Sequence, residues 1–314
     1  MTERRGSVGT SIVAALVAMV LLAACSGTGP GRQETQRRDA EVVVASFNFP
    51  ESTVLAEIYA RAIEAAGIPV RRELDLGPRE LVQPALLGGL VDVVPEYLGT
   101  SLASLGAPVD VAPTDAGAVR DGLARALTSR GVQVLDAAPA QNQNGLVVTR
   151  ATAERYRLAA VSDLAGVAGD LALAGPPECP QRPFCLSGYQ RVYGLHFARF
   201  MPLDTEQQRA TALDDGVVDV AVMFTTDGRL ATGDLVLLRD DRRLQPNENV
   251  VPLLSSRAVE RYGARLVDSI NGVSARLTTN SLRFLNWRIS IAHRDVSTEA
   301  RGWLERQSLV RSPR

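Results

Sequence analysis

Lysine is absent from this 314-residue sequence, and histidine, cysteine and aromatic residues are scarce. The two histidines, His196 and His293, form no paired zinc-ligand pattern, and neither Gly-x-Ser-x-Gly nor Gly-x-x-x-x-Gly-Lys-Ser/Thr occurs. The formal net charge is -1, which gives no indication of nucleic-acid binding. These absences argue against hydrolases of the serine type, metalloenzymes and nucleotide-driven enzymes. We therefore expect no catalytic residues, no metal, no cofactor and no nucleic-acid partner.

The longest apolar run covers only residues 11–24 and follows Arg4 and Arg5. A helix needs about 20 apolar residues to cross a bilayer, so this run is too short for a membrane span. A positive start followed by a short apolar core is typical of a signal peptide. We predict one over residues 1–24.

The residues around Cys25 suggest how this signal peptide ends. Leu22-Ala23-Ala24-Cys25, followed by Ser26 and Gly27, resembles the lipobox of bacterial lipoproteins. The resemblance implies cleavage before Cys25 and a lipid on its thiol, with residues 25–40 as a polar tether. An ordinary secretory signal with an incidental cysteine is the alternative. The expected location is outside the cytoplasm, anchored to the cell membrane by the lipid on Cys25.

The two other cysteines, Cys179 and Cys185, are six positions apart in a proline-rich segment. Outside the cytoplasm, a pair this close can close a local loop as a disulfide. A zinc site is the alternative, but no histidine or third cysteine lies nearby. We predict the disulfide.

Short apolar strands alternate with amphipathic helices from Glu41 onward, which favours βαβ units and an α/β fold. The first half predicts strands at 42–45, 70–76, 91–94 and 133–135, with helices at 50–66, 78–87 and 116–129. A second sheet is predicted from strands at 146–149, 171–174, 217–224 and 235–238. After a strand at 250–254, the tail predicts helices at 257–262, 264–273, 278–291 and 297–305. These helices have few strands of their own to cover, so we expect them on the first sheet. The predicted lobes are therefore 41–140 plus 250–314, and 141–249.

One short pattern occurs twice. Gly89-Leu90-Val91-Asp92-Val93 is followed by Tyr97, and Gly216-Val217-Val218-Asp219-Val220 is followed by Phe224. Ligands of open α/β sheets bind outside the carboxyl ends of strands, so both rings are predicted to face one crevice. Chance similarity between buried strands is the alternative. The two aspartates are predicted to fix strand ends by accepting backbone hydrogen bonds.

Binding has better candidate residues than catalysis. Rings that follow strands, at Tyr97, Phe224 and Phe47, could hold a quaternary ammonium group by its attraction to their faces. Arg182, in the segment that contains the cysteine pair, could bind a carboxylate through two parallel hydrogen bonds. From spacing alone, a solvated surface arginine is an equally good interpretation of Arg182.

Several motifs follow one another in a fixed order along the chain. The most specific is Pro95-Glu96-Tyr97-Leu98-Gly99-Thr100. The others are Ala45-Ser46-Phe47-Asn48-Phe49-Pro50-Glu51, Gly77-Pro78-Arg79-Glu80, Phe224-Thr225-Thr226-Asp227-Gly228 and Leu244-Gln245-Pro246-Asn247-Glu248-Asn249. In this order they resemble the glycine betaine/carnitine/choline substrate-binding proteins of ABC transporters, and the resemblance covers the range from about Glu41 to Leu309.

The resemblance implies a periplasmic-binding-protein-like fold of type II, with two lobes that each contain a mainly parallel sheet. It also implies a ligand cleft between the lobes. By position, Tyr97 and Phe224 would be walls of an aromatic cage, Thr100 a polar contact and Arg182 the partner of a solute carboxylate. Phe47 and Asn48 would complete the ligand-binding set.

This sequence departs from the family pattern at two places. Phe47 stands where the family often has a lysine, and Gln143-Asn144-Gly145-Leu146 stands where it often has a tyrosine. One basic contact and one ring are therefore missing from the implied site.

Together these patterns predict a monomeric receptor lipoprotein of an osmoprotectant ABC importer. Its partners would be a quaternary ammonium solute, the permease and, through the lipid, the membrane. Hinges are predicted near 139–142 and 249–252. The same fold with another small solute is the nearest alternative, followed by a sensory lipoprotein or a cell-envelope enzyme.

Overall fold

The computed structural model describes residues 40–106 and 115–310. Contacts within the chain divide it after Glu41, and everything from Val42 onward belongs to one compact unit. The predicted signal peptide, the predicted lipidation site Cys25 and all but the last residue of the predicted tether lie outside the described residues. In the described ranges, every helix is too short or too polar for a membrane span.

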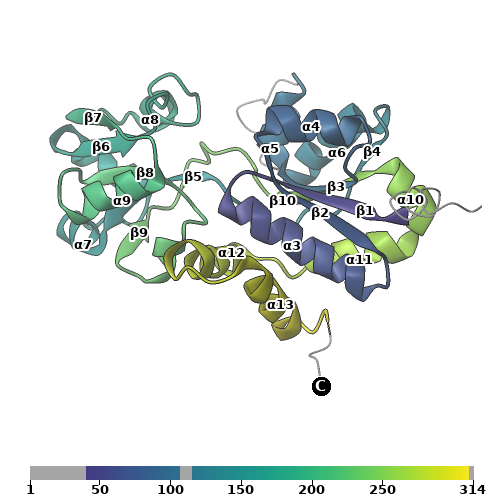
Figure 1. Ribbon diagram of the computed structural model, residues 1–314. Helices are drawn as coiled ribbons and strands as arrows, with labels where there is room; N and C mark the ends of the chain where they lie inside the picture. The colour runs from purple at the N-terminus through teal and green to yellow at the C-terminus, as the bar shows by residue number, and fades with distance from the viewer. Residues whose placement is uncertain (1–39, 107–114, 311–314) are drawn as a thin grey trace, which may run out of the picture. The chain divides into compact units, whose positions relative to one another are not determined.

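The first sheet contains five strands in the order β2-β1-β3-β10-β4 (Figure 1). Their bounds are β1 (Val42–Phe47), β2 (Val70–Gly77), β3 (Val93–Tyr97), β4 (Val132–Val134) and β10 (Val250–Ser255). β1 pairs in parallel with β2 and β3, whereas β10 is antiparallel to β3 and β4. The inner strands β1, β3 and β10 are buried along their whole length. Valine-rich runs of this kind suit strands that are covered on both faces.

The second sheet repeats this arrangement in the order β7-β6-β8-β5-β9. Its strands are β5 (Asn144–Thr149), β6 (Ala172–Gly175), β7 (Arg199–Pro202), β8 (Val220–Phe224) and β9 (Leu235–Leu237). β6 is parallel to β7 and β8, and β5 is antiparallel to β8 and β9. Four of the five strands in each sheet therefore run in one direction, as predicted for mainly parallel sheets, and β10 and β5 are the reversed strands. β5 and β10 are also the strands by which the chain enters each sheet from the other.

Helices cover both faces of the first sheet (Figure 1). One face carries α3 (Pro50–Ala65) and the C-terminal helices, which share a core with β1. These helices are α10 (Ser256–Tyr262), α11 (Ala264–Ser274), α12 (Thr279–Asn286), the π-helix η4 (Trp287–Ile291) and α13 (Val296–Arg306). The other face carries α4 (Arg79–Leu87), α5 (Leu98–Ser104) and α6 (Ala116–Thr128). The prediction that the tail covers the first sheet is confirmed.

Shorter helical segments surround the second sheet. They are α7 (Arg150–Tyr156), η1 (Val161–Gly166), η2 (Ala168–Asp170), α8 (Leu186–Tyr193), α9 (Glu206–Asp214) and η3 (Gly228–Ala231). Cys179 and Cys185 form a disulfide just before α8, and both are buried in the core with Tyr189. The cysteine pair thus fixes the loop that leads from β6 into α8.

The two predicted aspartates do fix strand ends. Asp92 accepts a hydrogen bond from the backbone NH of Val43 at 3.0 Å, and Asp219 accepts one from Ala172 at 2.9 Å. Val43 lies near the start of β1, and Ala172 is the first residue of β6. The repeated sequence pattern therefore reflects a repeated structure, and chance similarity is excluded.

Two chain segments connect the sheets side by side. Gln141 forms an isolated antiparallel bridge with Asn249, and the NH of Asn142 donates to the carbonyl of Glu248 at 3.0 Å. Residues 139–142 and Asn249 of the predicted hinges lie in these segments, whereas residues 250–252 belong to β10. α12 also contacts η3, so the tail touches the second sheet's elements as well as the first.

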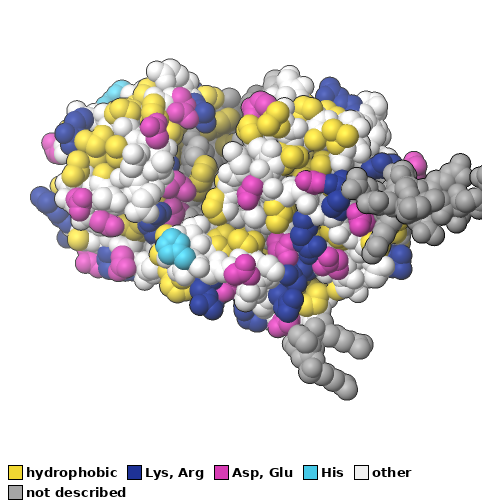
Figure 2. All heavy atoms as spheres, in the orientation of Figure 1, with side chains coloured by type: hydrophobic (Ala, Val, Ile, Leu, Met, Phe, Trp, Pro, Cys, Tyr) yellow, Lys and Arg dark blue, Asp and Glu magenta, His cyan; other side chains and the backbone are white. Residues whose placement is uncertain are grey.

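Acidic and basic side chains are interspersed on the visible face of the described residues (Figure 2). Opposite charges also pair within the fold: Arg72 forms ion pairs with both Glu57 and Glu64. The mixture agrees with the net charge of -1.

Candidate ligand-binding site

Three aromatic rings form a row at the carboxyl ends of β1 and β3. The rings of Phe47 and Phe49 are 5.9 Å apart and nearly parallel, and Phe49 stacks on Tyr97 at 6.3 Å. Phe47 ends β1, Tyr97 ends β3, and Phe49 lies between β1 and α3. Phe49 is 37% exposed, while the other two rings are buried. The row therefore offers one accessible ring, supported from both sides.

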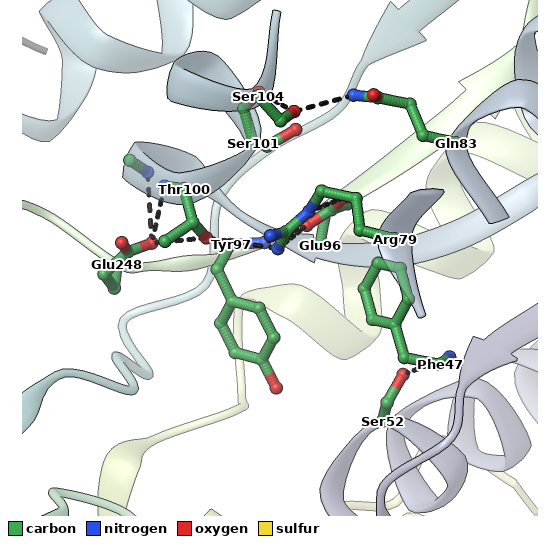
Figure 3. A network of polar contacts seen from close by, with 11 residues as sticks. Phe47, Ser52, Arg79, Gln83, Glu96, Tyr97, Thr100, Ser101, Ser104 and Glu248 are labelled. Atoms are coloured by element: carbon green, nitrogen blue, oxygen red, sulfur yellow. Dashed lines mark hydrogen bonds and ion pairs between the residues drawn. The ribbon is translucent and has the colours of Figure 1, made fainter. Parts of the chain in front are cut away.

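Arg79 joins this row to a polar network at the start of α5 (Figure 3). Its guanidinium lies 5.3 Å from the centre of the Phe47 ring and forms two hydrogen bonds with Glu96, at 2.9 and 3.0 Å. It also donates to the Thr100 hydroxyl at 3.2 Å. A ring face and a carboxylate thus hold this guanidinium in one orientation.

Glu248 closes the same network from the segment before β10. One of its oxygens accepts the NH groups of Gly99 and Thr100, at 3.1 and 3.2 Å. Burial raises the pKa of Glu248 to about 7, against the lowering effect of the Thr100 NH and the Arg79 charge. The Glu248 carboxyl group therefore changes between its protonated and charged forms near neutral pH.

Glu51 lies at the other end of the aromatic row and accepts three hydrogen bonds from side chains. The donors are the Tyr97 hydroxyl at 2.6 Å, Asn142 at 2.9 Å and Asn286 at 2.6 Å. Glu51 is 5% exposed, in the first turn of α3, where the helix dipole favours a negative charge. Burial, and then the charge of Glu51, raise the pKa of the Tyr97 hydroxyl well above its usual value. Tyr97 therefore stays protonated and donates to Glu51.

The second sheet contributes Phe224 at the carboxyl end of β8. Its ring is 45% exposed, and its backbone NH donates to Glu206 at 2.7 Å. Burial raises the pKa of Glu206 to about 7, and the charge of Asp227 acts in the same direction. Asp227 itself is paired with Arg229 at 2.9 Å.

The segment beside Phe224, where the family often has a tyrosine, contains Asn144 and Gly145. Asn144 lies opposite Phe224 in the β5–β8 ladder. A Cβ atom at Gly145 would lie 2.4 Å from a methyl group of Leu237. The Leu237 side chain thus occupies the space into which a side chain at position 145 would extend.

The two ring-bearing strand ends are linked through α12. The Asn286 amide that donates to Glu51 also donates to the carbonyl of Thr226 at 2.8 Å. Arg283 donates to the carbonyl of Thr225 at 2.6 Å. Two residues, Glu51 and Asn286, therefore connect Tyr97 to the loop that directly follows Phe224.

The remaining predicted site residues lie in different surroundings. The Arg182 side chain is 62% exposed and pairs with Glu178 at 2.8 Å, which matches the surface interpretation of this arginine. Asn48 is exposed, and its backbone NH donates to Gly77 at 3.2 Å. Phe47 is 3% exposed and belongs to the core under α4. Thr100 lies within the network of Arg79 and Glu248.

Sequence reasoning missed Phe49, Arg79 and Glu51 as site residues. All three stand in motifs that carried the family resemblance, so a signal was present. Phe49 and Glu51 flank Pro50, which begins α3, and a ring at the start of a helix that follows a strand is a place where ligands bind.

Comparison with known proteins gives the family. Residues 40–306 match the model of the substrate-binding domain of ABC-type glycine betaine transport systems. The chain belongs to this family. The resemblance inferred from the sequence motifs is thereby confirmed, and so is the type of function: a solute-binding component of an ABC importer, which works outside the cytoplasm.

Individual relatives are distant. A glycine-betaine-binding protein of Pseudomonas aeruginosa is 29% identical over 92% of this chain and 94% of its own length. An ergothioneine transport permease/ergothioneine binding protein of Helicobacter pylori is 22% identical over 85% of this chain. This chain spans only 48% of that relative. A solved structure titled as a glycine betaine/carnitine/choline ABC transporter has a TM-score of 0.79 at 23% identity, covering 86% of this chain and 99% of the other. The structural likeness confirms the two-lobed periplasmic-binding-protein fold.

Proposed function

We propose that this protein binds a quaternary ammonium solute against the aromatic row and delivers it to an ABC permease. The supporting observation is the stacking of Phe49 on Tyr97 at the carboxyl ends of two adjacent strands, close to the buried carboxylate of Glu51. Each ring face would contribute about 0.5 to 2 kcal/mol to binding of a desolvated cation. Phe224, exposed at the end of β8, would supply a ring from the second sheet.

Arg79 is the proposed partner for a solute that also carries a carboxylate. Its guanidinium contacts the ring row, and the Thr100 hydroxyl lies beside it. Arg182 was the prediction from the sequence, but its partner in the structure is the surface residue Glu178. The two arginines can be separated experimentally. Arg79→Gln should weaken binding of glycine betaine about tenfold more than that of choline, which has no carboxylate, whereas Arg182→Gln should change neither. The opposite pattern would restore the assignment to Arg182.

The membrane attachment is also part of the proposal. Lipid on Cys25 would hold the binding domain at the outer surface of the cell membrane, where a monomer could dock on the permease. Labelling of the expressed protein with a radioactive fatty acid tests this attachment. Cys25→Ala should abolish the label, and persistence of the label in that variant would contradict it.

A calorimetric screen tests the proposed ligand class. The full chain would be titrated with glycine betaine, choline, carnitine and ergothioneine, and with glucose and glutamate as unrelated solutes. Binding of at least one of the first four, and of neither unrelated solute, is the expected result. Binding only of the unrelated solutes would contradict the proposal.

The role of the row is tested with Tyr97→Ala, which should weaken binding of the best solute tenfold or more. Tyr156→Ala is the matched control, since Tyr156 is a partly buried ring on α7 at the edge of the second core. Equal affinities of the two variants would exclude Tyr97 from the site.

A further inference from the structure

We propose that Glu51 is a positioning residue that couples the ring of Tyr97 to the loop after Phe224, so that both rings move between binding and non-binding positions together. This inference rests on the proposed function, because it assigns Tyr97 and Phe224 to one binding site.

The three donors of Glu51 come from three separate parts of the fold. Tyr97 ends β3, Asn142 lies in the connection from β4 to β5, and Asn286 ends α12. All three of these donor side chains are neutral, so the charge of Glu51 is met by hydrogen bonds from uncharged groups. A buried carboxylate held this way depends on every donor, since an unmet hydrogen bond of a buried charge is costly.

Asn286 is the donor that reaches the second sheet. Its amide nitrogen bonds both the Glu51 carboxylate and the carbonyl of Thr226, two residues after Phe224. Tyr97, Glu51, Asn286 and Thr226 thus form a continuous chain of hydrogen bonds between the two ring-bearing strand ends.

The loop after Phe224 is held tightly against Asn286. A Cβ atom at Gly228 would lie 2.4 Å from the backbone nitrogen of Trp287, so only glycine permits this approach. The π-helix η4 begins at Trp287, directly after Asn286. Irregular turns of this kind occur often at functional sites. A shift of the loop must therefore either carry Asn286 with it, away from Glu51, or break the hydrogen bond between Asn286 and Thr226.

The coupling follows from this geometry. When the loop after Phe224 moves away and carries Asn286 with it, Glu51 loses one donor, and its remaining donors, including the Tyr97 hydroxyl, must rearrange around it. Discrete alternatives of this type, not gradual deformation, are typical of packed interfaces. Glu51 would therefore hold the Tyr97 ring in its binding position only when Phe224 is also in its binding position.

A double-mutant cycle tests the coupling. Glu51→Gln preserves the shape of the side chain but places an amide among three donors. Tyr97→Phe removes the hydroxyl and keeps the ring. With glycine betaine as titrant, each single variant should bind about tenfold more weakly than the wild type. The affinity of the double variant should also fall about tenfold, not a hundredfold, because both changes break the same link.

Glu64→Gln, the same substitution near the exposed end of α3, is the control and should bind as the wild type does. Additive losses would overturn the proposal.

A second measurement needs no solute and so does not depend on the ligand class. Hydrogen–deuterium exchange of the full chain should be at least fivefold faster at residues 225–228 in Glu51→Gln than in the wild type. Exchange in β5 should be unchanged. Unchanged exchange at 225–228 would overturn the coupling even if binding is impaired.

The outcomes remain distinguishable. If Glu51→Gln does not fold, Asn286→Ala replaces it in both experiments, since it removes the link to Thr226 and leaves Glu51 two donors. If the wild type binds none of the four candidate solutes, the proposed function fails, and the exchange measurement alone decides the coupling.

Discussion

The two sheets have the same strand order but differ in what covers their ring-bearing ends. β2-β1-β3-β10-β4 corresponds strand by strand to β7-β6-β8-β5-β9. In both, the aspartate just before the third strand in this order (β3 and β8) accepts a hydrogen bond from the backbone near the start of the second strand (β1 and β6). A glycine with positive φ precedes each aspartate: φ is 72° at Gly89 and 68° at Gly216. The same short sequence pattern thus produces the same backbone twice.

The rings that follow these strands have different surroundings. Tyr97 is 6% exposed, whereas Phe224 is 45% exposed. After β1, the chain forms the 16-residue helix α3, whose first turn places Glu51 against Tyr97. After β6, the equivalent of β1, it forms the disulfide loop and the 8-residue helix α8. The difference shows that the strand pattern fixes the position of a ring, while the helix packed above it decides whether that ring is buried or free to meet a ligand.

The largest expected effect concerns Asp92 and Asp219, the equivalent aspartates of the two sheets. Asp92 is 2% exposed and also accepts hydrogen bonds from Ser255 at 2.6 Å and Arg257 at 2.9 Å, while Asp219 accepts one from the backbone NH of Ala172. Asp92→Ala should lower the free energy of unfolding by about 3 kcal/mol, and Asp219→Ala by about 1 kcal/mol. Urea unfolding of both variants measures the difference. Equal losses would mean that the two strand ends are equivalent in energy as well as in geometry.

A smaller effect is expected at two close-packed glycines, one after each ring. A Cβ at Gly228 would meet backbone atoms of Trp287 at 2.4 and 2.5 Å, but at Gly99 its nearest neighbour would be the Asn247 carbonyl at 3.0 Å. Gly228→Ala should therefore cost about 2 kcal/mol of stability and Gly99→Ala about 1 kcal/mol. Thermal unfolding of the two variants provides the comparison. A harmless Gly228→Ala would show that the loop and α12 separate easily, which would also weaken the proposed coupling.

The smallest effect concerns two glutamates, one near each ring. Burial raises the pKa of Glu248 and of Glu206 to about 7 from 4.5. Between these values the folded protein holds protons that the unfolded chain releases, so the free energy of unfolding falls as pH rises from about 4.5 to 7. Glu248→Gln should reduce this fall by about 1 kcal/mol. Glu206→Gln should reduce it less, because Glu206 is only half-buried.

The control for this experiment is Glu154→Gln, an exposed residue on α7 that removes the same charge. Denaturation measured at several pH values between 4 and 8 should give the wild-type slope for this variant. If Glu248→Gln also keeps the full slope, its carboxyl group does not hold a proton in the folded state at pH 6.

Much of the fold could be predicted from the sequence. Every strand predicted from apolar runs is present in the structure. The tail helices were predicted to cover the first sheet because few strands lie near them in the sequence, and they do pack on that sheet. β7 was missed, since Arg199–Pro202 is a partly exposed strand at the sheet edge that ends in proline. The direction of β5 and β10 was missed as well, because strand direction depends on which sheet a segment enters and leaves no periodic signal.

The candidate site was less predictable. Tyr97 and Phe224 were found because a repeated strand pattern precedes both. Phe49, Arg79 and Glu51 were missed because their importance comes from neighbours distant in sequence: Glu51 meets Asn286, 235 positions away. Arg182 was selected for its chemistry, yet its partner is Glu178 in the same segment.

The sequence by itself determined the strands, the family and the repeated aspartate, since each depends on residues close together along the chain. Hydrophobic periodicity and local hydrogen bonds act over a few residues, so they can be recognised in the sequence. Only the tertiary structure decided which ring is accessible and which carboxylate holds Tyr97. Those properties arise from the packing of α3 and α12 around the strand ends, where side chains from remote segments share one buried hydrogen-bond network.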